Sequence, residues 1–146
     1  MATWQFDLFI VPAEDALPVL EEHGWRLPQL PAASTLQAQG ILVPALGRAW
    51  LMLDDWIVFG DENGTRADLV FDDADNVEIR MRLDVSATNA ELDAICGFAL
   101  ALNARFFDPV TRTLLHPDCN TLACALAASR AAARAAAAWS SYILLI

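Results

Sequence analysis

Residues 77–85 carry the strictest pattern in the chain. Apolar and charged residues alternate there without a break: Val77, Glu78, Ile79, Arg80, Met81, Arg82, Leu83, Asp84 and Val85. Because successive side chains of a β-strand point to opposite faces, the alternation predicts a strand with one apolar and one charged face. Such a strand requires partner strands beside it and a second layer over its apolar face.

Two further strand-like runs precede it, at residues 50–59 and 66–71. The break between them contains Asn63-Gly64, a pair that tolerates the positive φ angles of a tight hairpin turn. The next break, residues 72–76, is a run of aspartates and asparagine whose side chains can bond the local backbone. The three runs together predict an antiparallel β-meander.

A helix over residues 89–104 is predicted to cover the apolar face of the meander. Thr88 and Glu91 have the spacing of a capping box, in which each side chain bonds the backbone of the other residue. Apolar residues follow at helical spacing: Leu92, Ile95, Cys96, Ala99, Leu102 and Phe106. A first strand is expected over 4–10, and a small hairpin over 106–115 that turns at Asp108-Pro109.

The fold class expected is therefore α+β, as one domain over residues 1–146. It should contain an antiparallel sheet of about four to six strands, with helices packed mainly on one face. A last helix is expected from near Thr121 to about Ser140, capped by Asp118 or Asn120. The apolar end, residues 142–146, should either pack back on the fold or form an interface, which makes it a candidate homodimer contact.

Two segments are less regular. Pro12 can open a helix that ends near His23, with Gly24 as its C-cap and Pro18 as a kink. Residues 26–48 contain prolines and glycines that interrupt any period, and no charged residue lies between Arg26 and Arg48. We expect this uncharged connection to pack against the body, with a short strand at 40–43.

The charge distribution excludes several kinds of partner. Residues 1–93 hold 17 acids and 5 arginines, a formal charge of −12, whereas residues 94–146 carry +2. An acidic surface repels phosphate backbones and anionic lipid, which argues against nucleic-acid and membrane-surface binding. Three cysteines without metal-ligand spacing indicate free thiols in a reducing cytosol, and the N-terminus lacks the basic start of a signal peptide. The location expected is cytoplasmic.

Residues for catalysis are sparse. His23 and His116 are the only imidazoles, and a pairing of His116 with Cys119 is disfavoured because neighbours in a bend rarely face one another. The absence of lysine excludes Schiff-base chemistry and a P-loop lysine, and residues 72–76 fail the calcium-loop pattern. Asp54 and Asp55 are expected within a strand, where they face opposite sides and cannot form a dyad on one face. We expect no enzyme, cofactor or metal site.

The charged face of the sheet has a structural interpretation. Arg80 and Arg82 could grip an anion, but four other charged residues are expected on the same face: Arg66, Asp68, Glu78 and Asp84. Such residues on neighbouring strands normally pair with one another, which predicts a cross-strand charge lattice.

The order of motifs along residues 50–130 resembles that of a known protein family. The motif of a tryptophan, Phe-Gly and a glycine turn at 56–64 is followed by 78–84, then by a helix at 92–102, a hairpin at 107–115 and an alanine- and serine-bearing helix at 126–129. Across residues 50–130 this order is similar to small bacterial immunity proteins encoded beside polymorphic toxins. The resemblance implies a cytoplasmic, non-catalytic protein that binds a toxin domain.

The leading hypothesis is therefore a non-catalytic protein-binding module, an immunity protein that neutralises a cognate toxin by direct contact. An acidic face would steer a basic toxin domain towards it. The partner-binding candidates lie at strand ends and hairpin tips: Asp54, Asp55, Asp61, Glu62, Asp72, Asp73 and Asp75. Two alternatives stay open: a small-ligand or enzymatic domain with a tryptophan-lined pocket between sheet and helix, and a structural subunit that oligomerises.

Overall fold

The computed structural model describes residues 5–14, 17–129, 134 and 137. Its strands are β1 (Gln5–Pro12), β2 (Val19–Glu21), β3 (Gly24–Arg26), β4 (Leu30–Pro31), β5 (Trp50–Leu53), β6 (Trp56–Gly60), β7 (Arg66–Phe71), β8 (Asn76–Asp84), β9 (Ala104–Asp108) and β10 (Thr113–Leu115). Its helices are the 3₁₀ helix η1 (Ala32–Ser34), α1 (Thr35–Leu46), α2 (Asn89–Ala101) and α3 (Cys119–Ala128).

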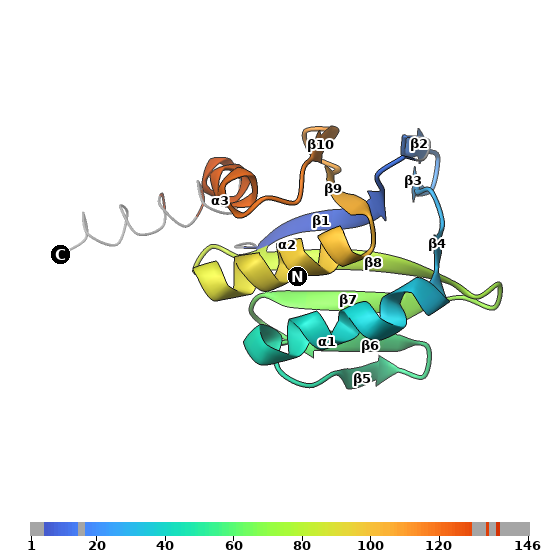
Figure 1. Ribbon diagram of the computed structural model, residues 1–146. Helices are drawn as coiled ribbons and strands as arrows, with labels where there is room; N and C mark the ends of the chain where they lie inside the picture. The colour runs from blue at the N-terminus through green and yellow to red at the C-terminus, as the bar shows by residue number, and fades with distance from the viewer. Residues whose placement is uncertain (1–4, 15–16, 130–133, 135–136, 138–146) are drawn as a thin grey trace.

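One antiparallel sheet organises the molecule (Figure 1). Its order is β10-β9-β1-β8-β7-β6-β5, and β4 adds a short pairing to β8. The described residues thus form an eight-stranded sheet, larger than the four to six strands expected, because β9, β10 and β4 join the meander and β1. The predicted α+β class is confirmed, as is the antiparallel pairing of the meander strands β6, β7 and β8.

Helices α1 and α2 lie side by side over one face of this sheet (Figure 1). The alternating residues of β8 point into that layer, since Ile79, Met81 and Leu83 are fully buried. They share one core with residues of α2 such as Ile95 and Phe98. The predicted apolar face and its helical cover are both confirmed.

The predicted capping box begins α2. The Glu91 backbone N–H donates to Thr88 Oγ1 at 3.1 Å, and the Thr88 N–H donates to Glu91 Oε1 at 2.9 Å. The helix ends at Ala101, three residues before the predicted end, and β9 then begins at Ala104. The hairpin of β9 and β10 also lies where it was predicted, after Asp108.

The predicted strand over 50–59 is wrong, because it is two strands. β5 ends at Leu53 and β6 begins at Trp56, with Asp54 and Asp55 in the turn between them. Two consecutive aspartates favour a turn over a strand interior, and here that local preference outweighs the apolar residues on both sides. Asp54 and Asp55 therefore do not lie on opposite faces of a strand.

The predicted helix from Pro12 to His23 is also wrong. Its second half contains β2, which pairs with the following β3 in a separate hairpin, and Gly24 in that hairpin has a φ of +125°. Pro18 lacks an N–H and disfavours the helical conformation at the residue before it, which removes the middle of the predicted helix. Trp25 anchors the hairpin on Phe107 of β9, with ring centroids 4.8 Å apart.

Residues 35–46 form helix α1, so the expected strand at 40–43 is wrong. Thr35, Ala38 and Leu42 are buried and point to the core, which confirms that the uncharged connection packs against the body. Gly40 and Pro44 are poor helix formers, but most helical stability in proteins comes from packing of a buried face. Close approach to α2 assists this packing, since a Cβ on Gly97 would lie 3.4 Å from Ile41 Cγ2.

Helix α3 begins at Cys119, two residues before the predicted start. Asp118 is its N-cap, and its Oδ2 accepts a bond from the Thr121 N–H at 3.1 Å. The predicted continuation to about Ser140 and the apolar end at 142–146 lie outside the described residues. The homodimer contact expected there stays a prediction.

Gly60 should be the least replaceable glycine of the sheet. Its φ is +106°, and an added Cβ would overlap the Thr65 carbonyl oxygen and lie 2.9 Å from Arg66 Cα. Gly60→Ala is expected to lower the free energy of unfolding by more than about 1 kcal/mol in urea unfolding. Gly40→Ala is the matched control, because a Cβ there meets nothing within 4 Å and should stabilise α1 by up to about 1 kcal/mol. Equal effects at both positions would contradict this account.

Candidate functional site

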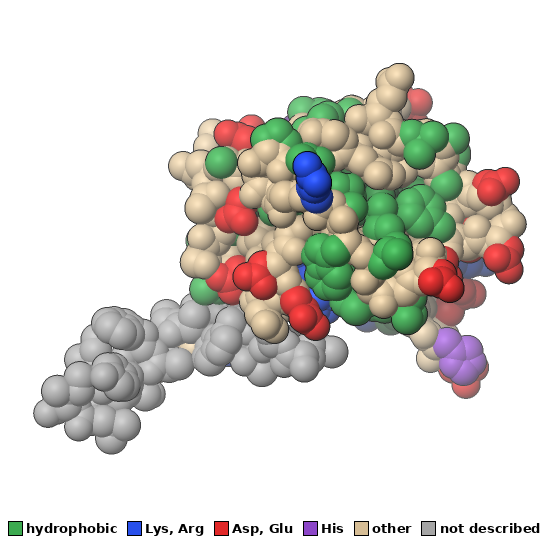
Figure 2. Space-filling view, turned by 90° about the horizontal axis from the view of Figure 1, so that it is seen from below, with side chains coloured by type: hydrophobic (Ala, Val, Ile, Leu, Met, Phe, Trp, Pro, Cys, Tyr) green, Lys and Arg blue, Asp and Glu red, His purple; other side chains and the backbone are tan. Residues whose placement is uncertain are grey.

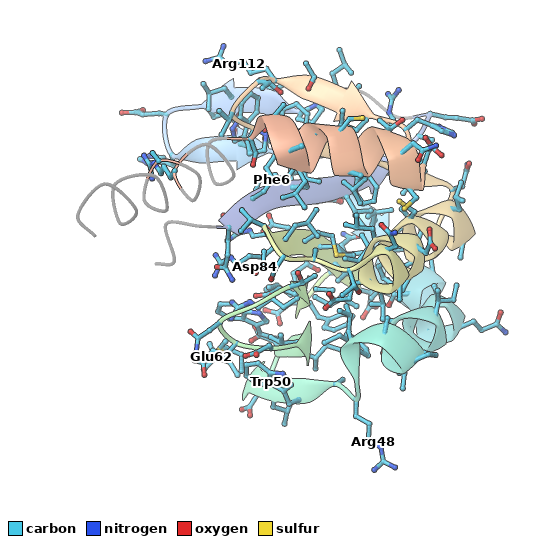
Figure 3. The ribbon with its side chains drawn as sticks, turned by 90° about the vertical axis from the view of Figure 1, so that its left-hand side faces the viewer. Phe6, Arg48, Trp50, Glu62, Asp84 and Arg112 are labelled. Atoms are coloured by element: carbon cyan, nitrogen blue, oxygen red, sulfur yellow. The ribbon has the colours of Figure 1, made fainter. Side chains whose placement is uncertain are left out.

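The meander divides the seven candidate acidic residues between the two ends of the sheet. Consecutive turns of an antiparallel meander alternate between ends, so the β5–β6 and β7–β8 turns lie together. A bond from the Phe71 N–H to the Asp55 carbonyl oxygen at 2.8 Å links them. We call the five carboxylates of these two turns the acidic end: Asp54, Asp55, Asp72, Asp73 and Asp75. Asp61 and Glu62 lie in the β6–β7 turn at the opposite end of the sheet, the end that is turned toward the viewer in Figure 3.

All seven carboxylates are exposed. Within the described part of the chain, the salt bridges join other residues, namely Arg26 with Glu21, Arg66 with Asp68, Arg80 with Glu78 and Arg82 with Asp7. None of the seven candidates is therefore neutralised by a described arginine. The acidic end presents uncompensated negative charge to solvent.

The turns at the acidic end are held by their own side chains. Asp72 Oδ1 accepts bonds from the N–H groups of Ala74 and Asn76, both at 2.9 Å. Asp75 has a φ of 59°, a left-handed conformation that aspartate and asparagine adopt more readily than most residues. The β7–β8 turn is therefore ordered before any partner arrives, which lowers the entropy cost of binding.

Charged residues on the charged face of the sheet pair with one another, but among the described residues only the Arg82–Asp7 ion pair joins two strands of the main sheet, whereas Arg80–Glu78 and Arg66–Asp68 each lie along one strand. Arg82 Nε lies 3.0 Å from Asp7 Oδ1 on the neighbouring strand, and Arg80 Nη2 lies 3.7 Å from Glu78. Arg80 also stacks over the ring of Phe9, 5.2 Å from its centroid. These contacts tie the arginines to protein groups, which supports the structural interpretation over an anion site.

Arg66 and Asp68 form a buried ion pair along β7. Two guanidinium nitrogens of Arg66 lie 2.9 and 3.0 Å from the two carboxylate oxygens of Asp68. The Trp56 indole N–H donates to the same carboxylate at 3.0 Å. Because both charged residues are almost fully buried, this group fixes the pairing of β6 and β7.

The cysteines and histidines do not form an activated nucleophile within the described chain. Burial raises the pKa of the Cys96 thiol to about 12, and a hydrogen bond with Asp93 raises the pKa of Cys119. Both shifts favour the neutral thiol, which is the weaker nucleophile. His116 is exposed, and the Asp118 carboxylate near it is occupied by the α3 cap. In the described residues, no three metal-ligating side chains converge.

A tryptophan-lined hollow exists, but it lies between the β2–β3 hairpin and the edge of the sheet. It has a volume of about 420 Å³ and is lined by Leu17, Pro18, Val19, Leu20, Trp25, Phe107, Arg112 and Leu114. Arg112, 5.8 Å above the Trp25 ring, is the only charged residue among these. Ligand sites usually combine an apolar lining with several converging polar groups. Trp50 and Trp56 do not line this hollow; they lie in β5 and β6, where their indole N–H groups donate to the Gly60 carbonyl oxygen and to Asp68.

The fold and the acidic end define an α+β protein with one helical layer and a charged meander. Comparison with protein families, with characterised proteins and with solved structures finds no match to this chain. Within the described residues, no helix has the length and apolar character needed to cross a membrane.

Proposed function

We propose that this chain is a non-catalytic protein-binding module, an immunity-type protein that neutralises a toxin by direct contact. The acidic end is the docking surface in this proposal. The observation that carries it is the set of five exposed carboxylates in two adjoining turns, without a described arginine to neutralise them.

A basic protein domain is the partner that fits this surface. Clustered negative charge raises the rate at which a positively charged partner arrives and disfavours partners of the same sign. Nucleic acid and anionic lipid carry the same sign as the acidic end and would be repelled. The resemblance to immunity proteins favours a toxin domain, such as a nuclease, as the basic partner.

The cytoplasm is the compartment in which we expect this binding. The three cysteines are free thiols, the state that a reducing cytosol maintains. An immunity protein there would meet a toxin as soon as it is synthesised or enters the cell.

Co-expression with the toxin domain encoded beside it tests the proposal. The tagged chain should capture that domain as a complex of fixed stoichiometry and restore growth to cells that the toxin domain alone arrests. Growth restored without a complex, or a purified pair that shows no heat of binding in calorimetry, would contradict direct neutralisation.

A further inference from the structure

Strand β5 leaves one edge of the main sheet without a partner in the described chain. It is the last strand in the sheet order, and its sequence Trp-Leu-Met-Leu contains no charge and no proline. Soluble proteins usually protect such edges with charged residues or proline, because unpaired backbone groups can pair with another strand. The opposite edge strand, β10, has only three residues. β5 is therefore the better edge for pairing.

Apolar side chains surround this edge. Leu51 is 66% exposed and Leu53 is 60% exposed. Figure 2, which looks at the molecule from the β5 side, shows hydrophobic side chains gathered across the middle of this surface with acidic side chains around them. Burial of these leucines against another molecule would remove apolar surface from water.

Charges of opposite sign stand at the two ends of β5. Arg48 precedes the strand by two residues and projects from the edge of the molecule (Figure 3), while Asp54 and Asp55 follow it directly. All three are exposed, and none forms a salt bridge with a described residue. The edge thus has a positive end, an apolar middle and a negative end.

This pattern is complementary to itself when two copies run antiparallel. If Leu51 pairs with Leu51 of a second copy, Arg48 stands opposite Asp54; if Leu51 pairs with Met52, Arg48 stands opposite Asp55. A parallel pairing would instead place like charges together, which costs free energy. We infer that two copies of this chain form a twofold-symmetric dimer by antiparallel pairing of their β5 strands.

The dimer should be weak and sensitive to salt. The strand has four residues, and its register with β6 shifts between Leu51 and Leu53, so its backbone is irregular there. Short and irregular edge strands limit edge pairing, so only a few backbone bonds can form. The charged contacts at the two ends are exposed and weaken as ionic strength rises.

Pairing would also gather the acidic turns. In an antiparallel dimer, the acidic end of one copy lies on the same edge of the joined sheet as the β6–β7 turn of the other. Asp61 and Glu62, which are separated from the acidic end within one chain, would then lie on the same edge as Asp72, Asp73 and Asp75, while Arg48 of the second copy pairs with Asp54 or Asp55. This consequence rests on the proposed function, whereas the dimer itself does not.

Sedimentation equilibrium of the full chain tests the dimer without any toxin. The wild-type chain should show a concentration-dependent average mass that approaches twice the monomer mass. Arg48→Asp and the double variant Asp54→Arg/Asp55→Arg should each stay monomeric, because like charges then meet at both ends of the strand. An equimolar mixture of the two variants should recover the doubled mass, because every end contact is again between opposite charges.

Several outcomes would overturn the inference. A wild-type chain that stays monomeric at every soluble concentration would do so, as would variants that dimerise as well as the wild type. A dimer that ignores both variants but disappears on deletion of residues 141–146 would assign the contact to the apolar C-terminus. Glu22→Arg, an exposed charge reversal away from β5, is the control and should leave the mass unchanged. None of these results depends on whether the acidic end binds a toxin.

Discussion

Asp68→Ala is expected to lower the free energy of unfolding by about 3–5 kcal/mol, because it leaves the Arg66 guanidinium buried without its counter-charge. Asp68 and Arg66 are only 4% and 6% exposed. The same change removes the acceptor of the Trp56 indole N–H on the neighbouring strand. Urea unfolding followed by circular dichroism measures the loss directly.

The control for this prediction is to remove both charges at once. Arg66→Met with Asp68→Leu should recover much of the stability lost in the single variant, because no buried charge then stays unpaired. The exposed pair of Arg26 and Glu21, 3.7 Å apart, provides a second comparison. Glu21→Ala should cost less than about 1 kcal/mol. A double variant as unstable as Asp68→Ala, or equal losses for the buried and the exposed pair, would show that the buried pair has no special weight.

Neutralising the acidic end should slow binding of a basic partner by about 10- to 1000-fold at low salt. The variant replaces all five aspartates by asparagine. Asparagine keeps the carbonyl oxygen that accepts bonds from Ala74 and Asn76, and it tolerates the left-handed conformation of Asp75. The fold should therefore stay intact while the charge is lost, and the effect should appear in the association rate constant more than in the dissociation rate constant.

Stopped-flow kinetics with the toxin domain measures this effect, at dilution at which the chain is monomeric. The matched control neutralises the two exposed acids at the opposite end of the sheet, with Asp61→Asn and Glu62→Gln. Its association rate should change far less than that of the five-residue variant. Similar losses per removed charge in the two variants would mean that net charge, and not the acidic end, steers the partner.

The sequence predicted those elements whose local pattern agrees with their surroundings in the fold. The alternation of residues 77–85 became β8 because one of its faces lies under two helices. The Thr88–Glu91 spacing became a capping box because it needs only neighbouring backbone. Helix α1 was missed for the opposite reason. Its glycine and proline argue against a helix locally, and the packing that stabilises it comes from α2, far along the chain.

The sequence predicted which acidic residues belong to the candidate site, but it did not predict how they divide between the two ends of the sheet. All seven acids lie in turns, but treating residues 50–59 as a single strand hid the turn at Asp54 and Asp55. Which end of the sheet each turn occupies follows from counting the turns along the meander, and a missing turn makes that count wrong. The structure therefore separates Asp61 and Glu62 from the other five. The same oversight concealed β5 as an edge strand, although the Asp-Asp pair was the signal that could have shown it.

Hydrogen–deuterium exchange of the chain, alone and bound to the toxin domain, tests the docking surface most directly. We predict slower exchange on binding in the β5–β6 turn and in the β7–β8 turn, with little change in α2. Protection confined to the β2–β3 hairpin or to the helices, with both acidic turns exchanging as in the free chain, would contradict the account.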